Sequence, residues 1–484
     1  MLKTVCAALT AATALLVLPA AAFADPDAEV AIMDDQLILT HKQVRVDGAM
    51  TVFGQLGVDR VRVSAYWRDI APSPRSTRKP RRFDSMDHTE RRYDWDNLDR
   101  VVDSANAHGL KLLISITTPG PVWASESPRR KNPVWKPKPV EFARFAQALA
   151  TRYADRVDMY ALMNEPNQGA WLQPQRVGNR LYSPYHYRRM VNGAYSRVKE
   201  ADPTSTVIIG ELAPTGGRGG DGTTRPMRPL TFLRELGCVN SRLNPTRRGY
   251  CRDFEAPAGD MFGTHPYQVR GKPSLRSRNR DDAAIADHER VFGVLDSLTS
   301  QGRILSMQKP LMDIYYTEFG YQTDPPDPHE GISRKRQDDY LQEAAFMTWQ
   351  QPRVRGNTQF RLTDGELRRG ERGRARYFEI QSGLLSSRGR PKPSYYNFFD
   401  PFWIENTRPR AGEPVLFWGQ VRPGGSQSYV LEYRPRRGEP WVAQFDSMTN
   451  EAGYFTSQFA PASGEYRFRW NEGVSATRSV RVRD

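Results

Sequence analysis

Two glutamates that close apolar runs are the residues of this sequence best placed to do chemistry. Glu165 follows the run 157–163 and precedes Pro166, which cannot continue the hydrogen-bonded ladder of a central strand. Glu318 comes near the end of the β-rich run 313–319. We therefore expect each carboxylate at the mouth of a buried strand. Two carboxylates that meet at such strand ends can supply the acid and the nucleophile that displacement at the anomeric carbon of a sugar requires.

Side chains of a strand alternate between its two faces, which sorts the residues next to the glutamates. Along the first run, Glu165 falls on the face of Ala161, and Asn164 falls on the opposite face. Along the second run, Glu318 falls on the face of Tyr316. The alternation therefore predicts that Asn164 and Glu165 point to opposite sides of their strand.

The segments around both glutamates resemble clan A retaining glycoside hydrolases, in particular the cellulase-like and family 39-like branches. Asn164-Glu165-Pro166 is similar to the acid/base motif of these enzymes, and Thr317-Glu318-Phe319-Gly320 is similar to their nucleophile strand. The resemblance implies an α/β fold, the (β/α)8 TIM barrel, with Glu165 as acid/base and Glu318 as nucleophile. It also implies hydrolysis of O-glycosidic bonds with net retention of anomeric configuration, and it implies no metal or organic cofactor.

Further residues match positions that clan A enzymes place around their carboxylates. By this resemblance, Arg62 matches an arginine that is hydrogen-bonded to the nucleophile, and Asn164 matches the amide that binds the 2-hydroxyl of the sugar. His265-Pro266-Tyr267 resembles a motif in which the tyrosine touches the nucleophile and the histidine lines the subsite. Without the resemblance, a solvent-exposed position for Arg62 and purely structural roles for His265 and Tyr267 are open alternatives.

Two tryptophans follow predicted strand ends and are suited to contact a sugar. Trp123 ends the segment 118–123, and Trp171 comes shortly after Glu165. The apolar face of a pyranose packs against an indole ring, so we predict that both tryptophans bind substrate. For Trp123, a position over the hydrophobic core is an equal alternative.

Apolar strands alternate with amphipathic helices along residues 25–403, which is typical of a parallel barrel. We predict strands at 36–40, 60–65, 111–117, 157–163, 206–210, around 261–267, 313–319 and 358–363. Between them we predict helices at 42–56, 97–107, 140–153, 187–199, 281–298 and 336–349. In the second strand, alternation separates Val61 and Val63 from Arg60 and Arg62. An arginine inside the barrel must be paired, because an unpaired buried charge is very unfavourable.

The pattern changes to alternating strands without helical periodicity after residue 403. Residues 404–484 are therefore predicted to form a small all-β sandwich of the immunoglobulin or fibronectin type. Its aromatic side chains recur at alternate positions, which favours a buried core over a carbohydrate-binding surface. The two apolar stripes consist of Tyr429, Leu431 and Tyr433, and of Tyr466, Phe468 and Trp470.

Residues 1–24 have the three parts of a secretory signal peptide: a charged start with Lys3, a short apolar run and a small-residue cleavage site. We expect cleavage after Ala24 and export of the protein. Cys238 and Cys251 remain after this cleavage, and an even number of cysteines in an exported chain favours a disulfide between them. Two free thiols are the alternative.

The formal net charge of +15 indicates attraction to anionic polymers such as acidic cell-wall glycans. A general preference for arginine would produce the same charge. No helix-turn-helix, zinc-finger or aromatic RNA-binding motif accompanies the charge, so we expect no nucleic-acid partner. The mean hydropathy of −0.66 and the shortness of the other apolar runs predict no transmembrane segment.

Together these features predict a secreted glycoside hydrolase that cleaves a polysaccharide or oligosaccharide by double displacement, and the basic loops suggest an acidic substrate. Two alternatives use the same barrel. A non-catalytic glycan-binding protein of the cell surface would release no reducing ends. A transglycosylase would use the same two carboxylates but pass the glycosyl group to another sugar. The identity of the glycan, the choice between endo and exo cleavage and the oligomeric state do not follow from the sequence.

Overall fold

The computed structural model describes most of the chain, namely residues 28–217, 219–471 and 473–484. The predicted signal peptide, residues 1–24, lies outside this range. Over the described residues, no helix combines the length and the apolar character that crossing a lipid bilayer requires. The chain divides into two compact units, which consist of Asp25–Phe399 with Arg422–Gly424 and of Asp400–Val421 with Gly425–Asp484.

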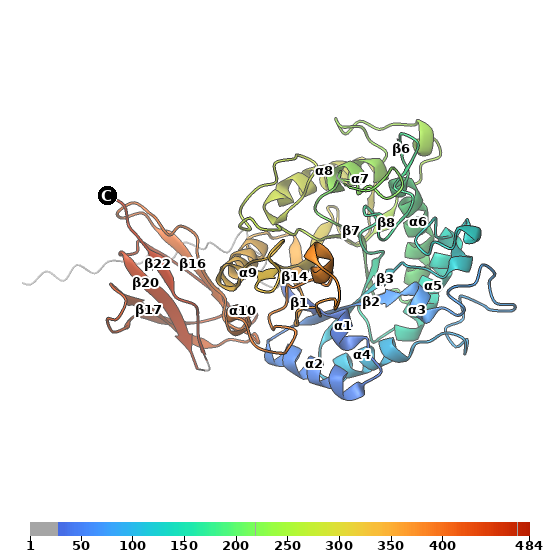
Figure 1. The fold of residues 1–484 in the computed structure, drawn as a ribbon. Helices are drawn as coiled ribbons and strands as arrows, with labels where there is room; N and C mark the ends of the chain where they lie inside the picture. The colour runs from blue at the N-terminus through green and yellow to red at the C-terminus, as the bar shows by residue number, and fades with distance from the viewer. Residues whose placement is uncertain (1–27, 218, 472) are drawn as a thin grey trace, which may run out of the picture. The chain divides into compact units, whose positions relative to one another are not determined.

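Eight parallel strands close into a barrel in the first unit (Figure 1). Each barrel strand pairs with the next one along the chain, and the last pairs with the first. The α/β barrel predicted from the alternation of strands and helices is thereby confirmed. The barrel strands are β1 (Glu29–Met33), β2 (Arg60–Tyr66), β3 (Lys111–Thr117), β4 (Met159–Leu162), β7 (Thr206–Leu212), β9 (Met261–Thr264), β11 (Asp313–Phe319) and β14 (Val354–Phe360).

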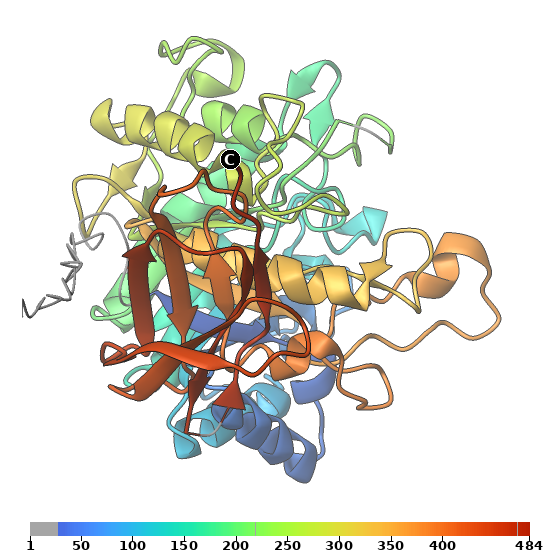
Figure 2. The ribbon, with the colours of Figure 1, turned by 90° about the vertical axis from the view of Figure 1, so that its left-hand side faces the viewer.

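Helices lie around the outside of the barrel, between its strands in the chain (Figures 1 and 2). In α4 (Asp96–Ala107), the residues Leu98, Val101 and Ala105 are spaced to share one face, and all are buried. Gly109 then reverses the chain with a left-handed φ of 69°. The other long helices are α2 (Gln43–Gln55), α5 (Pro139–Tyr153), α6 (Ser183–Ala201), α7 (Pro229–Leu236), α8 (His288–Ser300) and α9 (Arg334–Trp349).

The barrel interior and the layer between strands and helices have separate apolar cores. The interior core consists of Leu113, Met159, Ala161, Ile208, Met261 and Tyr315. Neighbouring residues of the same strands, such as Tyr160 and Tyr316, belong to the outer core that packs against the helices. The alternation predicted for β2 is confirmed, because Val61 and Val63 lie in the outer core whereas Arg62 reaches the interior.

Arg60 is paired inside the barrel, as its burial requires. It is 2% exposed, and it donates to Glu29 Oε2 at 2.7 Å and to Asp158 Oδ2 at 2.9 Å. Lys111 also donates to Glu29, at 2.8 Å. Because Glu29, Arg60 and Lys111 each begin a strand, these ion pairs balance charge at the amino-terminal end of the barrel.

The predicted first strand at 36–40 is wrong. Asp35–Ile38 form the short helix α1, and the first barrel strand is β1. Glu29 makes this run look polar in the sequence, but Arg60 and Lys111 neutralise its carboxylate. Strand β14 also begins at Val354, earlier than predicted.

The second unit is a β-sandwich of antiparallel strands, as predicted. One sheet contains β15 (Phe402–Ile404), β16 (Val415–Gln420) and β19 (Tyr454–Phe459), and the other contains β17 (Ser428–Arg434), β18 (Val442–Met448), β20 (Gly464–Trp470), β21 (Gly473–Val474) and β22 (Arg478–Val480). Figure 2 shows these strands side by side at the red end of the colour range. Both sheets contribute to one core, where Phe417 and Phe455 meet Tyr429, Leu431 and Phe468. The aromatic stripes therefore serve the core of this unit.

Candidate active site

Glu165 and Glu318 meet at one cavity of about 440 Å³ at the carboxyl ends of the barrel strands. We call this the active-site cavity. Asn164, Trp171 and Tyr267 also line it. The carboxylates of Glu165 and Glu318 each place one oxygen in a group whose atoms all lie within 4.8 Å of one another. Residues far apart in the sequence therefore come close enough to act on the same bond.

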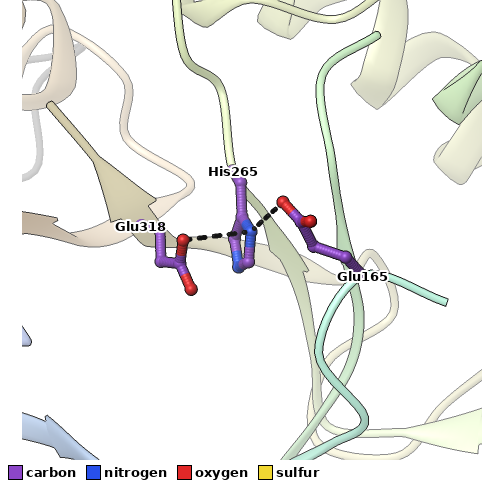
Figure 3. Close-up of side chains that lie close together, drawn as sticks. All are labelled: Glu165, His265 and Glu318. Atoms are coloured by element: carbon purple, nitrogen blue, oxygen red, sulfur yellow. Dashed lines mark hydrogen bonds and ion pairs between the residues drawn. The ribbon is translucent and has the colours of Figure 1, made fainter. Parts of the chain in front are cut away.

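His265 lies between the two carboxylates, and Figure 3 shows both glutamate side chains pointing toward it. Its Nδ1 is 2.9 Å from Glu165 Oε1 and 3.6 Å from Glu318 Oε2. Burial opposes a charge on this imidazole, but the carboxylates of Glu318 and Glu165 outweigh that effect and raise the pKa of His265 above its usual value. His265 can therefore carry a proton between the two acids.

An irregularity in β11 turns Glu318 into the barrel. Tyr315 packs in the interior core and Tyr316 in the outer core, so plain alternation would point Glu318 outward with Tyr316. The pairing of β11 with β14 shifts register between Tyr316 and Phe319. Such a bulge re-aims the side chains that follow it, so Glu318 faces the cavity while Phe319 packs outward.

Strand β7 has a similar register shift, and it turns a third glutamate, Glu211, toward the barrel interior. Ile208 packs inward and Ile209 outward, and the pairing of β7 with β9 then shifts register between Ile209 and Leu212. Gly210 and Glu211 have left-handed φ values of 103° and 46°. The shift turns the Glu211 carboxylate inward, where it is fully buried.

At the end of β4, the chain leaves the strand with left-handed φ values of 74° at Met163 and 41° at Glu165. Both Asn164 and Glu165 consequently line the active-site cavity. The prediction that these two side chains point to opposite sides is therefore wrong. Strand alternation does not extend beyond Leu162, where β4 ends.

Arg62 joins three of the site residues from within the barrel. It is fully buried and donates to Glu318 Oε1, Glu211 Oε1 and Asn164 Oδ1, each at 2.8 Å. Burial opposes its charge, but the carboxylates of Glu211 and Glu318 raise the pKa of Arg62 above its usual value. Arg62 is therefore a permanent cation that orients the site, and it does not point to solvent.

Tyr267 donates its hydroxyl to Glu318 Oε2 at 3.0 Å. Burial and the nearby Glu318 carboxylate raise the pKa of this phenol well above its usual value, so it remains a donor. Both oxygens of Glu318 thus accept a hydrogen bond, one from Arg62 and one from Tyr267. The resemblance implied these contacts for Arg62 and Tyr267.

Asn164 and Trp171 are the predicted binding residues that line the cavity. Because Asn164 Oδ1 accepts from Arg62, its amide nitrogen is left to donate toward the cavity. Trp171 stacks on Tyr66 with ring centroids 6.3 Å apart and planes at 13°. Since Tyr66 also lines the cavity, the two rings form an aromatic wall suited to the apolar face of a sugar.

Three of the residues predicted to bind substrate do not line the cavity, namely Arg62, Trp123 and His265. Trp123 is 1% exposed and packs edge-to-face against Trp67 and Phe83, while its indole nitrogen donates to Pro72 O. It belongs to the hydrophobic core, which is the alternative that the sequence left open. His265 is also fully buried and acts through Glu165, so it does not line a subsite.

The sequence analysis missed Tyr66, which lines the cavity, and it also missed the buried Glu211. Its Oε1 accepts from Arg62, and its Oε2 accepts from Ser115. The sequence signal was a single acidic residue within the otherwise apolar run 206–212. A carboxylate in such a run requires a buried partner, and Arg62 supplies it.

Cys238 and Cys251 form the predicted disulfide, with their Cα atoms 5.6 Å apart. The prediction of a bridge is thereby confirmed. Cys238 follows α7, and Arg188 from α6 donates to its sulfur at 3.3 Å. The bridge closes the loop between α7 and the strands that follow.

Glu165, His265 and Glu318 are also residue types that hold metal ions. In this site the atoms of the group that face one another already have protein partners. Glu318 accepts from Arg62 and Tyr267, and the Nδ1 of His265 is directed at Glu165. The donor set therefore fits proton transfer between acids, and a cation would have to displace these contacts.

Known proteins resemble parts of this chain. Residues 38–229 match the family model described as Cellulase (glycosyl hydrolase family 5). This segment includes Arg62, Asn164, Glu165 and Glu211. The search of curated proteins finds no match.

Solved structures resemble this chain at low sequence identity. A family 39 glycoside hydrolase from the gut symbiont Bacteroides cellulosilyticus WH2 is 14% identical, with a TM-score of 0.51 over 90% of this chain and 79% of that one. GH5_18 from Streptomyces cattleya, solved in complex with GlcNAc, is 15% identical, with a TM-score of 0.49 over 77% and 78%. A Bacteroides uniformis β-glucuronidase is 12% identical, with a TM-score of 0.45 over 95% of this chain but 47% of its own length.

The family-model match over residues 38–229 and the closed barrel together indicate a glycoside hydrolase. The protein is therefore a glycosidase, an enzyme that hydrolyses O-glycosyl compounds, and its substrate is a carbohydrate.

Proposed function

We propose that this glycosidase retains the anomeric configuration of its substrate, with Glu165 as general acid/base and Glu318 as nucleophile. The close approach of their carboxylate oxygens, within 4.8 Å, carries the proposal. Retaining enzymes keep their carboxyl groups about 5–5.5 Å apart, whereas inverting enzymes keep about 6.5–9.5 Å to admit a water molecule. The short separation supports direct attack by one carboxylate.

The partners of the two glutamates support this division of roles. Arg62 and Tyr267 hold both oxygens of Glu318, which fixes the orientation of the carboxylate for attack. Glu165 has His265 as its partner, and an imidazole can take up or release a proton. Proton transfer therefore falls to Glu165.

The reaction then runs in two steps. Glu165 donates its proton to the glycosidic oxygen while Glu318 attacks the anomeric carbon and the bond to the leaving sugar breaks. Glu165 next takes a proton from a water molecule, whose oxygen displaces Glu318 from the anomeric carbon. Asn164 donates to the 2-hydroxyl of the bound sugar, and the aromatic wall of Tyr66 and Trp171 binds its apolar face.

The substrate we propose is a polysaccharide or oligosaccharide met outside the cell. Export is supported by the signal-peptide pattern of residues 1–24, and the disulfide between Cys238 and Cys251 suits an oxidising compartment. Amino-terminal sequencing of the secreted protein should find Asp25 first. An uncleaved amino terminus on the secreted protein would contradict this part of the proposal.

Covalent trapping tests the assignment of the nucleophile. The wild-type protein is treated with a panel of 2,4-dinitrophenyl 2-deoxy-2-fluoro-β-glycosides, and peptide mass spectrometry should find the sugar on Glu318. Glu318→Ala should lose activity, and azide should restore it with a product of inverted configuration. An exposed-site control, Glu366→Gln, should label normally. Label on another residue, or an inverted product from the wild type, would overturn the proposal.

A further inference from the structure

A second cavity, of about 590 Å³, adjoins the active-site cavity on the side of Glu165. Glu165 and Pro214 line the first cavity, and Gln168 and Thr215 line the second. Gln168 Nε2 donates to Thr215 O at 3.1 Å, which ties the two border segments together. A glycan chain that passes over Glu165 therefore reaches this second cavity next.

Among the described residues, two arginines line the second cavity, which we call the arginine cavity. Arg228 is a quarter exposed and pairs with Asp282 at 2.5 Å. Arg278 is exposed, and within the described residues its guanidinium has neither an ion-pair nor a hydrogen-bond partner. Asp282 thus neutralises one of the two charges, and Arg278 keeps its donors free.

Gly216 and Gly217 lie close against Met227 and Arg228. A Cβ atom at Gly216 would lie 2.4 Å from the backbone of Met227, so these two backbone segments touch. A Cβ atom at Gly217 would lie 3.2 Å from the Arg228 guanidinium. The absence of side chains at both glycines therefore leaves the space that Arg228 occupies.

The loop that carries Arg278 is basic beyond this one residue. Segment 268–282 has five basic residues and two acidic ones, and both acids are already paired, Asp281 with Arg234 and Asp282 with Arg228. The five basic residues are Arg270, Lys272, Arg276, Arg278 and Arg280. Only Arg276 has a carboxylate partner among the described residues, Glu289. The positive charge around the cavity is therefore not balanced by the protein.

The active-site cavity and a further cavity beside it do not favour an anionic group of the substrate. The described residues that line the active-site cavity include Glu165 and Glu318 but no lysine or arginine. A further cavity, of about 260 Å³, shares Ser64 and Tyr66 with the active-site cavity and is lined by three aspartates, namely Asp35, Asp69 and Asp94. A carboxylate on the substrate is therefore disfavoured at both places by like charge.

We propose that Arg228 and Arg278 form a subsite for the carboxylate of a uronic acid, on the leaving-group side of a neutral sugar that is cleaved. This inference rests on the proposed function, because Glu165 protonates the leaving group and its neighbours face that part of the glycan. The planar guanidinium of arginine binds carboxylates in two parallel hydrogen bonds. Arg228 already binds one carboxylate oxygen, Asp282 Oδ1, at 2.5 Å, and Arg278 offers a free guanidinium to the ligand.

Binding by full-length Glu318→Gln protein tests the subsite without requiring cleavage. The probes are hyaluronan, gellan and glucuronoxylan, each compared with its carboxyl-reduced form, and dextran sulfate. At least one native polymer should bind about tenfold more tightly than its reduced form at about 0.15 M salt. Arg278→Ala in the same background should remove this preference. Arg280→Ala, which deletes the same charge outside the cavity, should keep it within about twofold.

Three outcomes would overturn the subsite. These are equal binding of native and reduced forms of every polymer, an equal loss with Arg280→Ala, and tightest Arg278-dependent binding of dextran sulfate, which would assign the subsite to sulfate. Failure of the proposed function is distinguishable. In that case the trapping experiment fails while the Arg278-dependent preference for a uronic acid persists.

Discussion

Glu211 and Glu318 share one guanidinium. Arg62 donates through Nη2 to Glu211 Oε1 and through Nη1 to Glu318 Oε1, both at 2.8 Å. Arg62 and Glu211 are fully buried, and Glu318 is 7% exposed. Each carboxylate reaches the arginine because a register shift turns it inward, one in β7 and one in β11. The proposed nucleophile, Glu318, is therefore held by a buried ionic network whose second acid, Glu211, does not line the cavity.

Glu211→Gln should lower the free energy of unfolding by about 3 kcal/mol, because it removes one partner of a buried ion pair. It should also reduce kcat, since Arg62 would no longer be fixed between two carboxylates. Urea denaturation measures the first effect, and steady-state kinetics measures the second. The exposed variant Glu366→Gln serves as control and should change neither. If Glu211→Gln has the same free energy of unfolding as the wild type, the ionic network does not contribute to stability.

Tyr267→Phe should lower kcat about tenfold to a hundredfold, because it removes a hydrogen bond to a charged carboxylate. The pKa of Tyr267 is raised well above its usual value by burial and by Glu318, so the wild-type phenol should keep donating up to about pH 10. The ratio of wild-type to variant kcat should therefore stay constant from neutral pH to that limit. A ratio that falls steadily across this range would contradict the assigned role.

The raised pKa of His265 leads us to expect that this residue contributes to stability in a pH-dependent way. Its pKa is raised in the folded protein by Glu318 and Glu165, against the effect of burial. A raised pKa means that the folded state binds the proton more tightly than the unfolded chain, where histidine titrates near about 6.5. The contribution is therefore fully present below that pH and is lost as the pH rises through the folded pKa.

Urea unfolding of the wild type and His265→Gln from pH 5 to pH 9 checks this dependence. The stability difference between them should be largest at the acidic end and should shrink as the pH rises. A difference that grows toward alkaline pH would have the wrong sign.

Substitution by alanine should have different effects at Trp171 and at Trp123, although both are predicted from the sequence to bind substrate. Trp171→Ala removes half of the aromatic wall, so KM should rise about threefold to tenfold with little loss of stability. Trp123→Ala creates a cavity in the core, so the free energy of unfolding should fall by about 3–5 kcal/mol. Kinetics and urea denaturation on both variants separate the effects. Equal losses of stability would refute the distinction.

Local patterns were sufficient to predict the barrel and most of its site. Alternation within β2 places Arg62 on the face opposite Val61 and Val63, and this holds because the strand is regular over its whole length, whereas the inward position of Arg62 was implied by the resemblance. The motifs around Glu165, Glu318 and Tyr267 predict residues that indeed meet, because each lies at the carboxyl end of its own strand and parallel strands of a barrel end at one face.

The remaining features depend on contacts between distant segments. The shifts that turn Glu211 and Glu318 inward exist only relative to the neighbouring strands, so alternation within one strand points both residues the wrong way. Trp123 is buried because Pro72 and Phe83, which belong to another loop, contact its indole. These features arise from tertiary contacts, and the residue pattern within a single segment does not predict them.

The disulfide between Cys238 and Cys251 should stabilise the protein by about 3 kcal/mol, because it closes a loop with a sequence separation of 13 and so restricts the unfolded chain. The double variant Cys238→Ala/Cys251→Ala should lower the urea midpoint accordingly. Reduction of the wild type with dithiothreitol should lower its midpoint to about the same value, while the double variant should not respond to the reductant. The bridge is expected to act by restricting the unfolded chain, so its effect should not depend on how the native protein packs around it. If reduction leaves the urea midpoint of the wild type unchanged, the bridge does not contribute to stability.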